Sequence, residues 1–283
     1  MAEILKGAPV AAALSEELIP RADKLKDNGI TPTLAILRVG ERGDDIAYET
    51  GAMKRCDKIG IAVKRFLLPS DCTKEQLLDI IRKVNADAAI HGCLLFRPLP
   101  DRDIEAAACE LLAPEKDVDG MTAGSLATVF AGKGSGYAPC TAQAVIELLD
   151  HYGVEIAGVR AAVLGRSLVI GRPVAMLLQH RNATVTVCHT KTENPPSICR
   201  EAKLLVAAAG KPGVVDGMYA AHGQTIVDVG INVDANGKLC GDVKFDEVEP
   251  LVKAITPVPA GVGSVTTAVL AKHVIEAAEK AAK

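Results

Sequence analysis

Short aliphatic runs recur along the chain, and each one ends at a glycine, a proline or a polar residue. In the second half of the sequence they read AAVLG (161–165), TVTVCH (184–189), AKLLVAAAG (202–210) and QTIVDVG (224–230). Apolar runs without polar alternation are typical of strands buried on both faces, as in a parallel sheet covered by helices. The pattern therefore predicts a Rossmann-type parallel sheet in this half of the chain, connected by crossover helices.

The first half alternates in the same way. Thr73 and Gln76 have the spacing of a capping box before a helix. A last helix is expected to begin after Ser264, which can cap it, and to pack back on the first half of the chain. Strands are predicted at 33–40, 61–69 and 92–96, and helices at 8–28, from Asp44 or Asp45 to Ile59, at 74–85 and at 102–112. We predict an α/β protein of two domains, residues 1–140 with 265–283, and residues 141–264.

Composition narrows the class of protein. The chain has 283 residues, of which 49% are hydrophobic and only 3% aromatic, so it can bury a large aliphatic core and exceeds the usual size of one domain. A net charge of −3, with both signs mixed along the chain, argues against nucleic-acid and anionic-membrane partners. The eight cysteines lack metal-binding spacing, and no apolar stretch reaches the roughly 20 residues of a membrane span. We expect a cytoplasmic protein with reduced thiols and no metal.

The turn after the first of the aliphatic runs is a candidate nucleotide-binding loop. Gly165 and Gly171 bracket this turn, although their spacing is not that of the GxGxxG fingerprint. An NAD site usually has a carboxylate near the end of the next strand, whereas here that strand ends in HTK (189–191), and Arg166 lies in the turn itself. Cationic and hydroxyl groups suit a 2′-phosphate, so NADP is favoured over NAD. The alternative is a structural turn, followed by ordinary solvated residues.

Several segments of the chain are specific when they are taken together. They are PLP (98–100), PEKDVDG (114–120), PCT (139–141), GRSLVIGRP (165–173), NATVTVCHTKT (182–192), DVGIN (228–232), GDV (241–243) and TPVPAGVG (256–263). With these segments the chain resembles the bifunctional methylenetetrahydrofolate dehydrogenase/methenyltetrahydrofolate cyclohydrolases over nearly its whole length. The resemblance implies a folate-binding α/β domain that faces a Rossmann domain across a cleft, a C-terminal helix that returns to the first domain, and a homodimer.

The resemblance also implies roles for individual residues. Tyr48 would flank the folate and Asp119 would hydrogen-bond the pterin ring, and both are candidate catalytic residues. Pro259, Gly261 and Gly263 would border the folate and the nicotinamide. Read without the resemblance, Asp119 is a loop-capping carboxylate, Tyr48 a helix-packing residue, and the two glycines turn residues. The cofactor-binding residues that it implies are Gly165, Arg166, Ser167, Gly171, His189, Thr190 and Ile231.

The chain departs from the family pattern at three positions. The family usually has a lysine four residues after the tyrosine, central to the hydrolytic step, and this position is Ala52. A family serine three residues before the tyrosine is Asp45, and the glutamine that supports the lysine is Phe96. Lys54 lies about 240° around the helix from Tyr48, whereas position 52 lies about 40° away, so Lys54 is expected to point elsewhere. Arg97 could reach the cleft and take the place of the missing lysine only after a local rearrangement.

These departures affect the two expected reactions differently. Hydride transfer from 5,10-methylenetetrahydrofolate to NADP requires proximity and alignment, while the cofactor carries the chemistry. Hydrolysis of the methenyl product to 10-formyltetrahydrofolate requires an activated water and a delivered proton, which suit a tuned lysine. We therefore expect a dehydrogenase with weakened or absent cyclohydrolase activity. The alternatives are a fully bifunctional enzyme with a substitute residue, a catalytically silent folate- or nucleotide-binding relative, and an unrelated two-domain dehydrogenase acting on amino acids or shikimate.

Overall fold

The computed structural model describes residues 1–235 and 237–282, which form two compact units. The six-stranded unit comprises residues 1–11 and 141–266, and the three-stranded unit comprises residues 12–140 and the chain from Thr267 onward. The predicted division placed residues 1–11 with the first half of the chain, which differs from this grouping. The reason is that β1 (Glu3–Ile4) pairs in parallel with β11 (Ala254–Ile255) and so becomes the edge of the other sheet.

The six-stranded unit contains the predicted Rossmann-type sheet. Every strand runs parallel to its neighbours, and each of the four aliphatic runs supplies one strand. In chain order the strands after β1 are arranged 2-1-3-4-5, so the direction of winding reverses beside β5, where open α/β sheets bind their ligands. The order is β1, β11, β8 (Thr225–Asp228), β7 (Leu204–Ala207), β5 (Arg160–Leu164), β6 (Thr184–Cys188).

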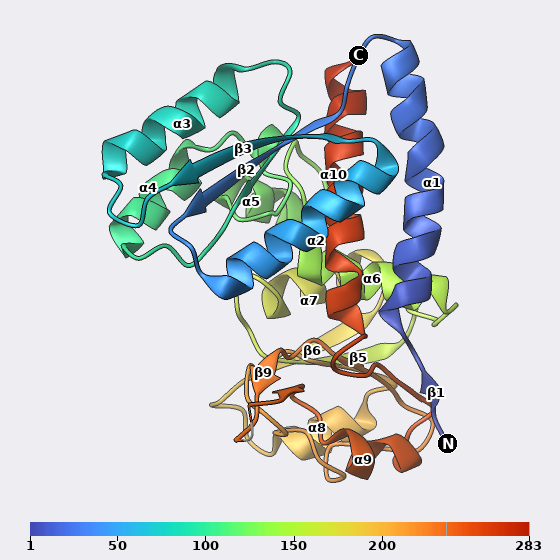
Figure 1. The fold of residues 1–283 in the computed structure, drawn as a ribbon. Coiled ribbons are helices and arrows are strands. Elements are labelled where there is room, and N and C mark those ends of the chain that lie inside the picture. Colours follow the sequence, from blue (N-terminus) through green and yellow to red (C-terminus); the bar gives the residue numbers. More distant parts are fainter. Residues whose placement is uncertain (236, 283) are drawn as a thin grey trace. The chain divides into compact units, whose positions relative to one another are not determined.

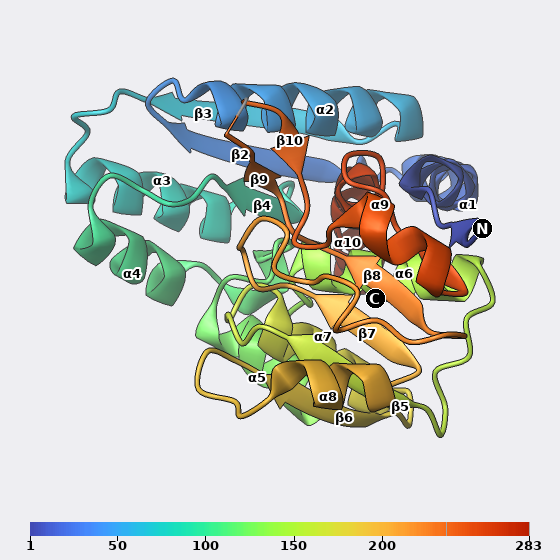
Figure 2. The ribbon, with the colours of Figure 1, turned by 90° about the horizontal axis from the view of Figure 1, so that it is seen from below.

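Helices cover both faces of this sheet. On one face α8 (Pro195–Glu201) and α9 (Phe245–Val248) enclose a core with Leu164, Leu205 and Ile226. The opposite face carries α6 (Cys140–His151) and α7 (Gly171–His180), as Figures 1 and 2 show. A small antiparallel pair, β9 (Asn232–Val233) and β10 (Leu239–Cys240), follows β8. The 3₁₀ segments η2 (Glu249–Leu251) and η3 (Val262–Ser264) flank β11.

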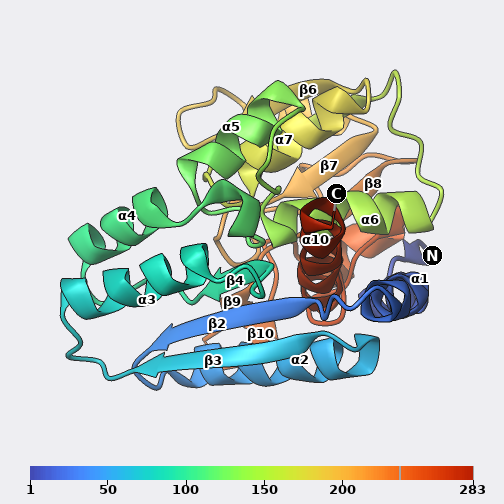
Figure 3. The same ribbon diagram turned by 90° about the horizontal axis from the view of Figure 1, so that it is seen from above.

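The three-stranded unit is built on a parallel sheet in the order β3 (Ala62–Leu68), β2 (Thr33–Val39), β4 (Gly92–Leu95). Alternate residues of β2 point to opposite faces. Ala35, Leu37 and Val39 pack with α3 (Lys74–Ala86) and α4 (Arg102–Leu111). Arg38 points to the other face, toward α2 (Gly43–Ile59), and Figure 3 shows α2 opposite α3 and α4.

The first and last long helices of the chain are in contact within this unit. Arg21 of α1 (Gly7–Asp27) pairs with Glu279 of α10 (Thr266–Ala281) at 2.8 Å, so the last helix packs on the first half of the chain as expected. The described residues contain no helix with the length and apolar character to cross a bilayer. Pattern analysis did not predict α5 (Ala123–Ala131), which Thr122 caps by accepting from the Ser125 N–H at 3.1 Å.

Of the helix N-terminal caps predicted above, the one at α3 is present and those at α2 and α10 are not. The capping box of Thr73 and Gln76 is present at the start of α3. Asp44 or Asp45 was expected to cap α2, but Arg42 occupies the cap position. The two aspartates lie in the first turn of α2, where a negative charge interacts favourably with the helix dipole. Ser264 was expected to cap the last helix, but it belongs to η3, which precedes α10.

Candidate functional site

The loop between β5 and α7 has a backbone that only glycine fits at its two ends. Gly165 has φ 125°, and a Cβ atom there would lie 2.0 Å from the Ala208 carbonyl oxygen. A Cβ atom on Gly171 would lie 2.3 Å from the Gly165 carbonyl oxygen. Ser167 Oγ accepts from the Ile170 N–H at 3.1 Å, which closes the turn. The loop is therefore a compact cradle at the carboxyl edge of the sheet, with the Arg166 and Ser167 side chains exposed.

The end of β6 adjoins this cradle because Leu164 pairs with Cys188, the last residues of β5 and β6. His189 follows directly and is half-buried, and its Nδ1 accepts from the Lys191 N–H at 3.1 Å. With Nδ1 as an acceptor, the neutral ring carries its proton on Nε2, which can donate to an anion. Thr190 is exposed beside it. These groups suit a phosphate, and they lie at the place where an NAD site has an acidic side chain that binds the ribose 2′-hydroxyl.

A pocket of about 220 Å³ lies farther along the same edge of the sheet. It brings together Ile231, Pro259, Gly261 and Gly263, the predicted residues that follow β8 and β11. The two glycines differ in what requires them. A Cβ atom on Gly261 would meet the Pro257 carbonyl oxygen at 2.3 Å, so the fold itself accounts for that glycine. Gly263 is exposed, and the nearest atom to a Cβ there would be Ile231 Cδ1 at 3.7 Å, so packing within the described residues does not require a glycine at this position.

In the three-stranded unit, α2 carries the altered positions 45 and 52, and the third altered residue, Phe96, directly follows β4. Ala52 is completely buried, with 0% of its surface exposed. The Tyr48 ring stands edge-on to the Phe96 ring, with centroids 6.0 Å apart and an interplanar angle of 81°. Lys54 is exposed, as its place around the helix predicts. An aromatic pair and a methyl group thus occupy the surroundings where the family pattern has a lysine and a glutamine.

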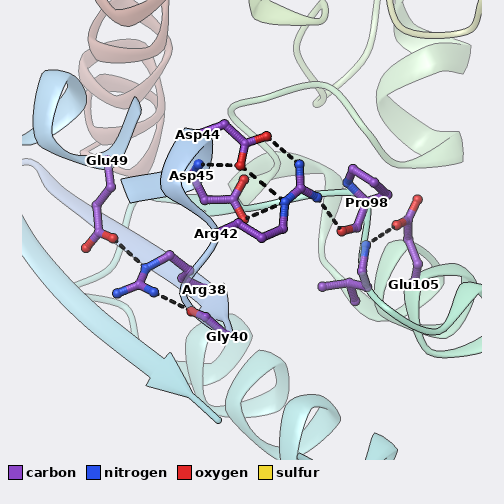
Figure 4. Close-up of polar contacts among 9 residues, drawn as sticks. Arg38, Gly40, Arg42, Asp44, Asp45, Glu49, Pro98 and Glu105 are labelled. Atoms are coloured by element: carbon purple, nitrogen blue, oxygen red, sulfur yellow. Dashed lines mark hydrogen bonds and ion pairs between the residues drawn. The ribbon is translucent and has the colours of Figure 1, made fainter. Parts of the chain in front are cut away.

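Buried charge near this face is already neutralised by arginines (Figure 4). Glu49 is buried and accepts from Arg38 Nε at 2.7 Å and from Arg65 Nε at 2.6 Å. Asp45 lies 3.8 Å from Arg42 Nε, and desolvation raises its pKa above the usual value. Sequence reasoning missed the Arg38–Glu49 pair because its partners come from a strand and a helix with no motif in common.

Asp119 follows the 3₁₀ turn η1 (Pro114–Lys116), in a loop that a second aspartate organises. Asp117 is fully buried and accepts from the N–H groups of Met121 at 3.0 Å and Thr122 at 2.7 Å. Asp117 therefore performs the loop-capping role that was the alternative for Asp119. Asp119 keeps part of its surface exposed, yet desolvation raises the pKa of its carboxyl group to about 6, and Asp117 adds to this rise.

Arg97 opposes that shift, since its positive charge lowers the pKa of Asp119. Its Nη1 lies 3.8 Å from Glu105 Oε1. Its Nε is buried without a hydrogen-bond partner in the described part of the chain. Arg97 is thus held near Asp119 and Glu105, and its guanidinium, which has no hydrogen-bond acceptor, cannot serve as a general base.

Comparison with known proteins gives consistent matches for both units. A model for the catalytic domain of tetrahydrofolate dehydrogenase/cyclohydrolase matches residues 5–119, and one for the NAD(P)-binding domain matches residues 139–282. The bifunctional protein FolD of Carboxydothermus hydrogenoformans is 51% identical over 281 residues, 99% of this chain and 98% of that protein.

Two solved structures are also similar over almost their full length. The bifunctional FolD dehydrogenase/cyclohydrolase of Campylobacter jejuni is 35% identical with a TM-score of 0.95, covering 99% of each chain. The Trypanosoma brucei dehydrogenase-cyclohydrolase, solved with NADP cofactor and inhibitor, is 34% identical with a TM-score of 0.92, covering 100% of this chain and 99% of that one.

Proposed function

This chain belongs to the tetrahydrofolate dehydrogenase/cyclohydrolase family, and from that premise we propose that it oxidises 5,10-methylenetetrahydrofolate to 5,10-methenyltetrahydrofolate with NADP. The observation that carries the proposal is the glycine-bracketed cradle after β5, in a chain that matches both family domains. NADP supplies the acceptor for the hydride that leaves the methylene carbon. The chain's own residues bind and align the two molecules.

On the folate side, we assign binding to Tyr48 and Asp119. The Tyr48 ring is held by Phe96 and presents a flat apolar surface for the pterin. The ionised Asp119 carboxylate accepts hydrogen bonds from pterin N–H groups, which fixes the orientation of the ring. Oxidation requires no proton transfer by a side chain, so the loss of the family lysine leaves this step intact.

On the cofactor side, the cradle from Gly165 to Gly171 receives the pyrophosphate through backbone N–H groups. Arg166, Ser167, His189 and Thr190 take the adenosine phosphate. Ile231, with Pro259, Gly261 and Gly263, borders the nicotinamide. The exposed arginine and the strand end without a carboxylate favour NADP over NAD.

The hydrolytic step is proposed to be strongly weakened or absent in this chain. Ring opening of the methenyl cation needs a water to be activated and a proton to be delivered. Ala52 cannot do either, and Phe96 offers no hydrogen bond to a neighbouring amine. Lys54 is exposed, and the Arg97 guanidinium has hydrogen-bond donors but no acceptor, so neither replaces the missing lysine. A prompt hydrolysis of the methenyl product would instead support the fully bifunctional alternative.

A homodimer in the cytoplasm without nucleic-acid or membrane partners completes the proposal. It rests on the family resemblance and on the net charge of −3, with charges of both signs mixed along the chain. The domain roles follow in the same way, with folate in the three-stranded unit and NADP in the six-stranded unit.

The activity is tested by mixing purified protein with 5,10-methylenetetrahydrofolate and NADP and recording NADPH formation. We expect turnover that depends on both substrates, with NAD a much poorer acceptor. Parallel reactions with shikimate or amino acids should give no NADPH. Absence of folate-dependent NADP reduction, with NADPH binding intact, would favour the silent relative over the enzyme.

Replacing Arg166 by alanine is expected to raise the KM for NADP about tenfold and to leave the KM for NAD nearly unchanged, because one exposed charge-assisted contact to a phosphate is lost. Arg160→Ala is the matched control, since Arg160 is an exposed arginine at the opposite end of β5. Equal effects of Arg166→Ala on both cofactors would contradict a contact with the 2′-phosphate.

A further inference from the structure

Two buried aspartates that the proposed mechanism does not use lie beneath the cofactor side of the six-stranded unit. Asp228 ends β8 and is 3% exposed, and Asp242 follows β10 and is 0% exposed. They belong to the segments DVGIN (228–232) and GDV (241–243). Buried carboxylates are costly unless they are well hydrogen-bonded, so each one calls for a specific set of donors.

Asp242 collects donors from the loop that follows β7. Its Oδ2 accepts from the N–H groups of Ala209 at 2.6 Å and Gly210 at 3.0 Å. Its Oδ1 accepts from the Lys211 N–H at 2.9 Å and from Asn232 Nδ2 at 2.9 Å. One carboxylate therefore fixes three consecutive peptide groups of the loop after β7 and also one residue of β9.

Asp228 collects donors from its own loop and from the segment that carries Asp242. Its Oδ1 accepts from the N–H groups of Gly230 at 2.9 Å and Asp242 at 3.0 Å, and its Oδ2 accepts from the Val243 N–H at 2.9 Å. Its backbone N–H donates to Thr256 Oγ1 at 2.7 Å. Thr256 directly precedes the Pro257–Gly263 wall of the 220 Å³ pocket, and Asp228 itself lines that pocket.

Two glycines, Gly230 and Gly241, allow the two aspartates to lie close to each other's backbone. A Cβ atom on Gly230 would lie 2.5 Å from Asp242 Oδ1, and a Cβ atom on Gly241 would lie 1.9 Å from Asp228 Oδ2. The glycine near each aspartate thus clears the space for the other carboxylate. Each aspartate therefore has a nearby glycine in its own segment, Gly230 for Asp228 and Gly241 for Asp242, and that glycine leaves room for the carboxylate of the other segment.

The loop held by Asp242 also touches the nucleotide cradle. Ala208 precedes the three peptide groups that Asp242 fixes, and its carbonyl oxygen is the atom that excludes a side chain at Gly165. The Ala208 N–H donates to the Leu164 carbonyl oxygen at 2.8 Å. The contacts therefore run from the pocket wall through Thr256, Asp228 and Asp242 to the cradle.

We propose that Asp228 and Asp242 form a carboxylate brace that positions the loops after β5, β7, β8 and β11 for NADP. This inference rests on the proposed cofactor site. The two aspartates act as positioning residues, since they hold backbone that contacts the cofactor. Loosening the brace releases the wall of the nicotinamide pocket and the cradle for the pyrophosphate together, so NADP binding weakens even though no side chain of the brace supplies the phosphate contacts.

Asp242→Asn tests the brace with almost no change in shape. Whichever oxygen the amide nitrogen replaces, that nitrogen faces two N–H donors and leaves them without an acceptor. We expect the Kd for NADPH, measured by fluorescence titration of the purified protein, to rise about tenfold or more. In turnover assays the KM for NADP should rise more than kcat falls.

Gln224→Glu is the matched control at the opposite end of β8. Gln224 is 1% exposed, and its Nε2 donates to the carbonyl oxygens of Cys199 at 2.6 Å and Ala202 at 2.8 Å. In Gln224→Glu an oxygen replaces the Nε2 amide and faces two carbonyl oxygens that are also acceptors. The control therefore loses two buried hydrogen bonds, as Asp242→Asn does, but at the end of the sheet away from the proposed cofactor site. We expect Gln224→Glu to lower the Tm while the Kd for NADPH stays within about twofold, which is the range of indirect effects of distant substitutions.

A second variant covers the case in which Asp242→Asn does not fold. Thr256→Val removes the hydroxyl that accepts from the Asp228 N–H at 2.7 Å and donates to the Asp228 carbonyl oxygen at 3.3 Å. The loss of these two hydrogen bonds should weaken NADPH binding several-fold. Near-normal NADPH affinity in the folded brace variants would overturn the inference, and so would an equal loss in Gln224→Glu. If the unaltered protein itself fails to bind NADPH, the proposed function fails first, so the two failures are distinguishable.

Discussion

Introducing lysine at position 52 together with glutamine at position 96 should raise methenyltetrahydrofolate hydrolysis by about 10²–10⁴-fold, the usual contribution of one general acid–base group. Ala52 lies one helical turn from Tyr48, and Phe96 stands against the Tyr48 ring. Lysine supplies the amine for proton transfer, and glutamine supplies the hydrogen bond that orients it. The decay of methenyl absorbance above the buffer rate measures the gain.

Single variants separate the two contributions. Ala52→Lys alone is expected to give little hydrolysis, because Phe96 leaves the new amine without a polar neighbour. Ala52 is 0% exposed, so any larger side chain costs about 1–3 kcal/mol of stability through overpacking. Ala52→Met with Phe96→Gln carries similar bulk without the amine and should remain inactive in hydrolysis. Full rescue by Ala52→Lys alone would show that Phe96 matters less than proposed.

Replacing Asp119 by asparagine is expected to lower kcat/KM for methylenetetrahydrofolate by about 10–100-fold, the value of a hydrogen bond to a charged group. The carboxylate accepts from pterin N–H groups only in its ionised form, and burial raises its pKa to about 6. Tetrahydrofolate affinity should therefore be highest above pH 6 and fall as the pH drops through that value.

The pH profile identifies the group responsible. In Asp119→Asn, the fall in tetrahydrofolate affinity near pH 6 should disappear, because no carboxyl group is left to titrate there. Asp57→Asn, at an exposed position of α2, is the control and should keep the normal profile. An unchanged profile in Asp119→Asn would assign the titration to another group.

The stability of the fold should depend on pH in the opposite direction to tetrahydrofolate affinity. The pKa of Asp119 is raised from about 4 in the unfolded chain to about 6 in the folded protein, so its contribution to the free energy of unfolding decreases as the pH rises from about 4 to 6.

The pattern of apolar residues predicts most of the strands and helices because each of them is a local signal. Four aliphatic runs became β5 to β8, and the capping box at Thr73 marked the start of α3. The position of β1 could not be predicted in this way. Its two residues, Glu3 and Ile4, pair with a strand about 250 positions later, and so short a segment has no periodicity.

The residues of the candidate site also divide into those that local sequence motifs predict and those that depend on tertiary contacts. Tyr48, Asp119 and the cradle glycines are predicted site residues because they belong to motifs, and the structure identifies Asp117 as the carboxylate that caps the loop before α5. The Arg38–Glu49 pair and the contacts between Asp228 and Asp242 depend on tertiary geometry. The glycines at 230 and 241 were the available signal for the aspartate pair, but their meaning depends on which backbone each carboxylate approaches.

A limited reaction in which both products are followed distinguishes the dehydrogenase from the bifunctional enzyme. Protein, NADP and a small known amount of 5,10-methylenetetrahydrofolate are mixed, and NADPH and methenyltetrahydrofolate are recorded together by their absorbance. We expect the two products to form in equal amounts and the methenyl signal then to decay at the rate seen without protein. Prompt loss of the methenyl signal while NADPH persists would contradict the loss of hydrolysis, and failure to form either product would contradict the proposed dehydrogenase.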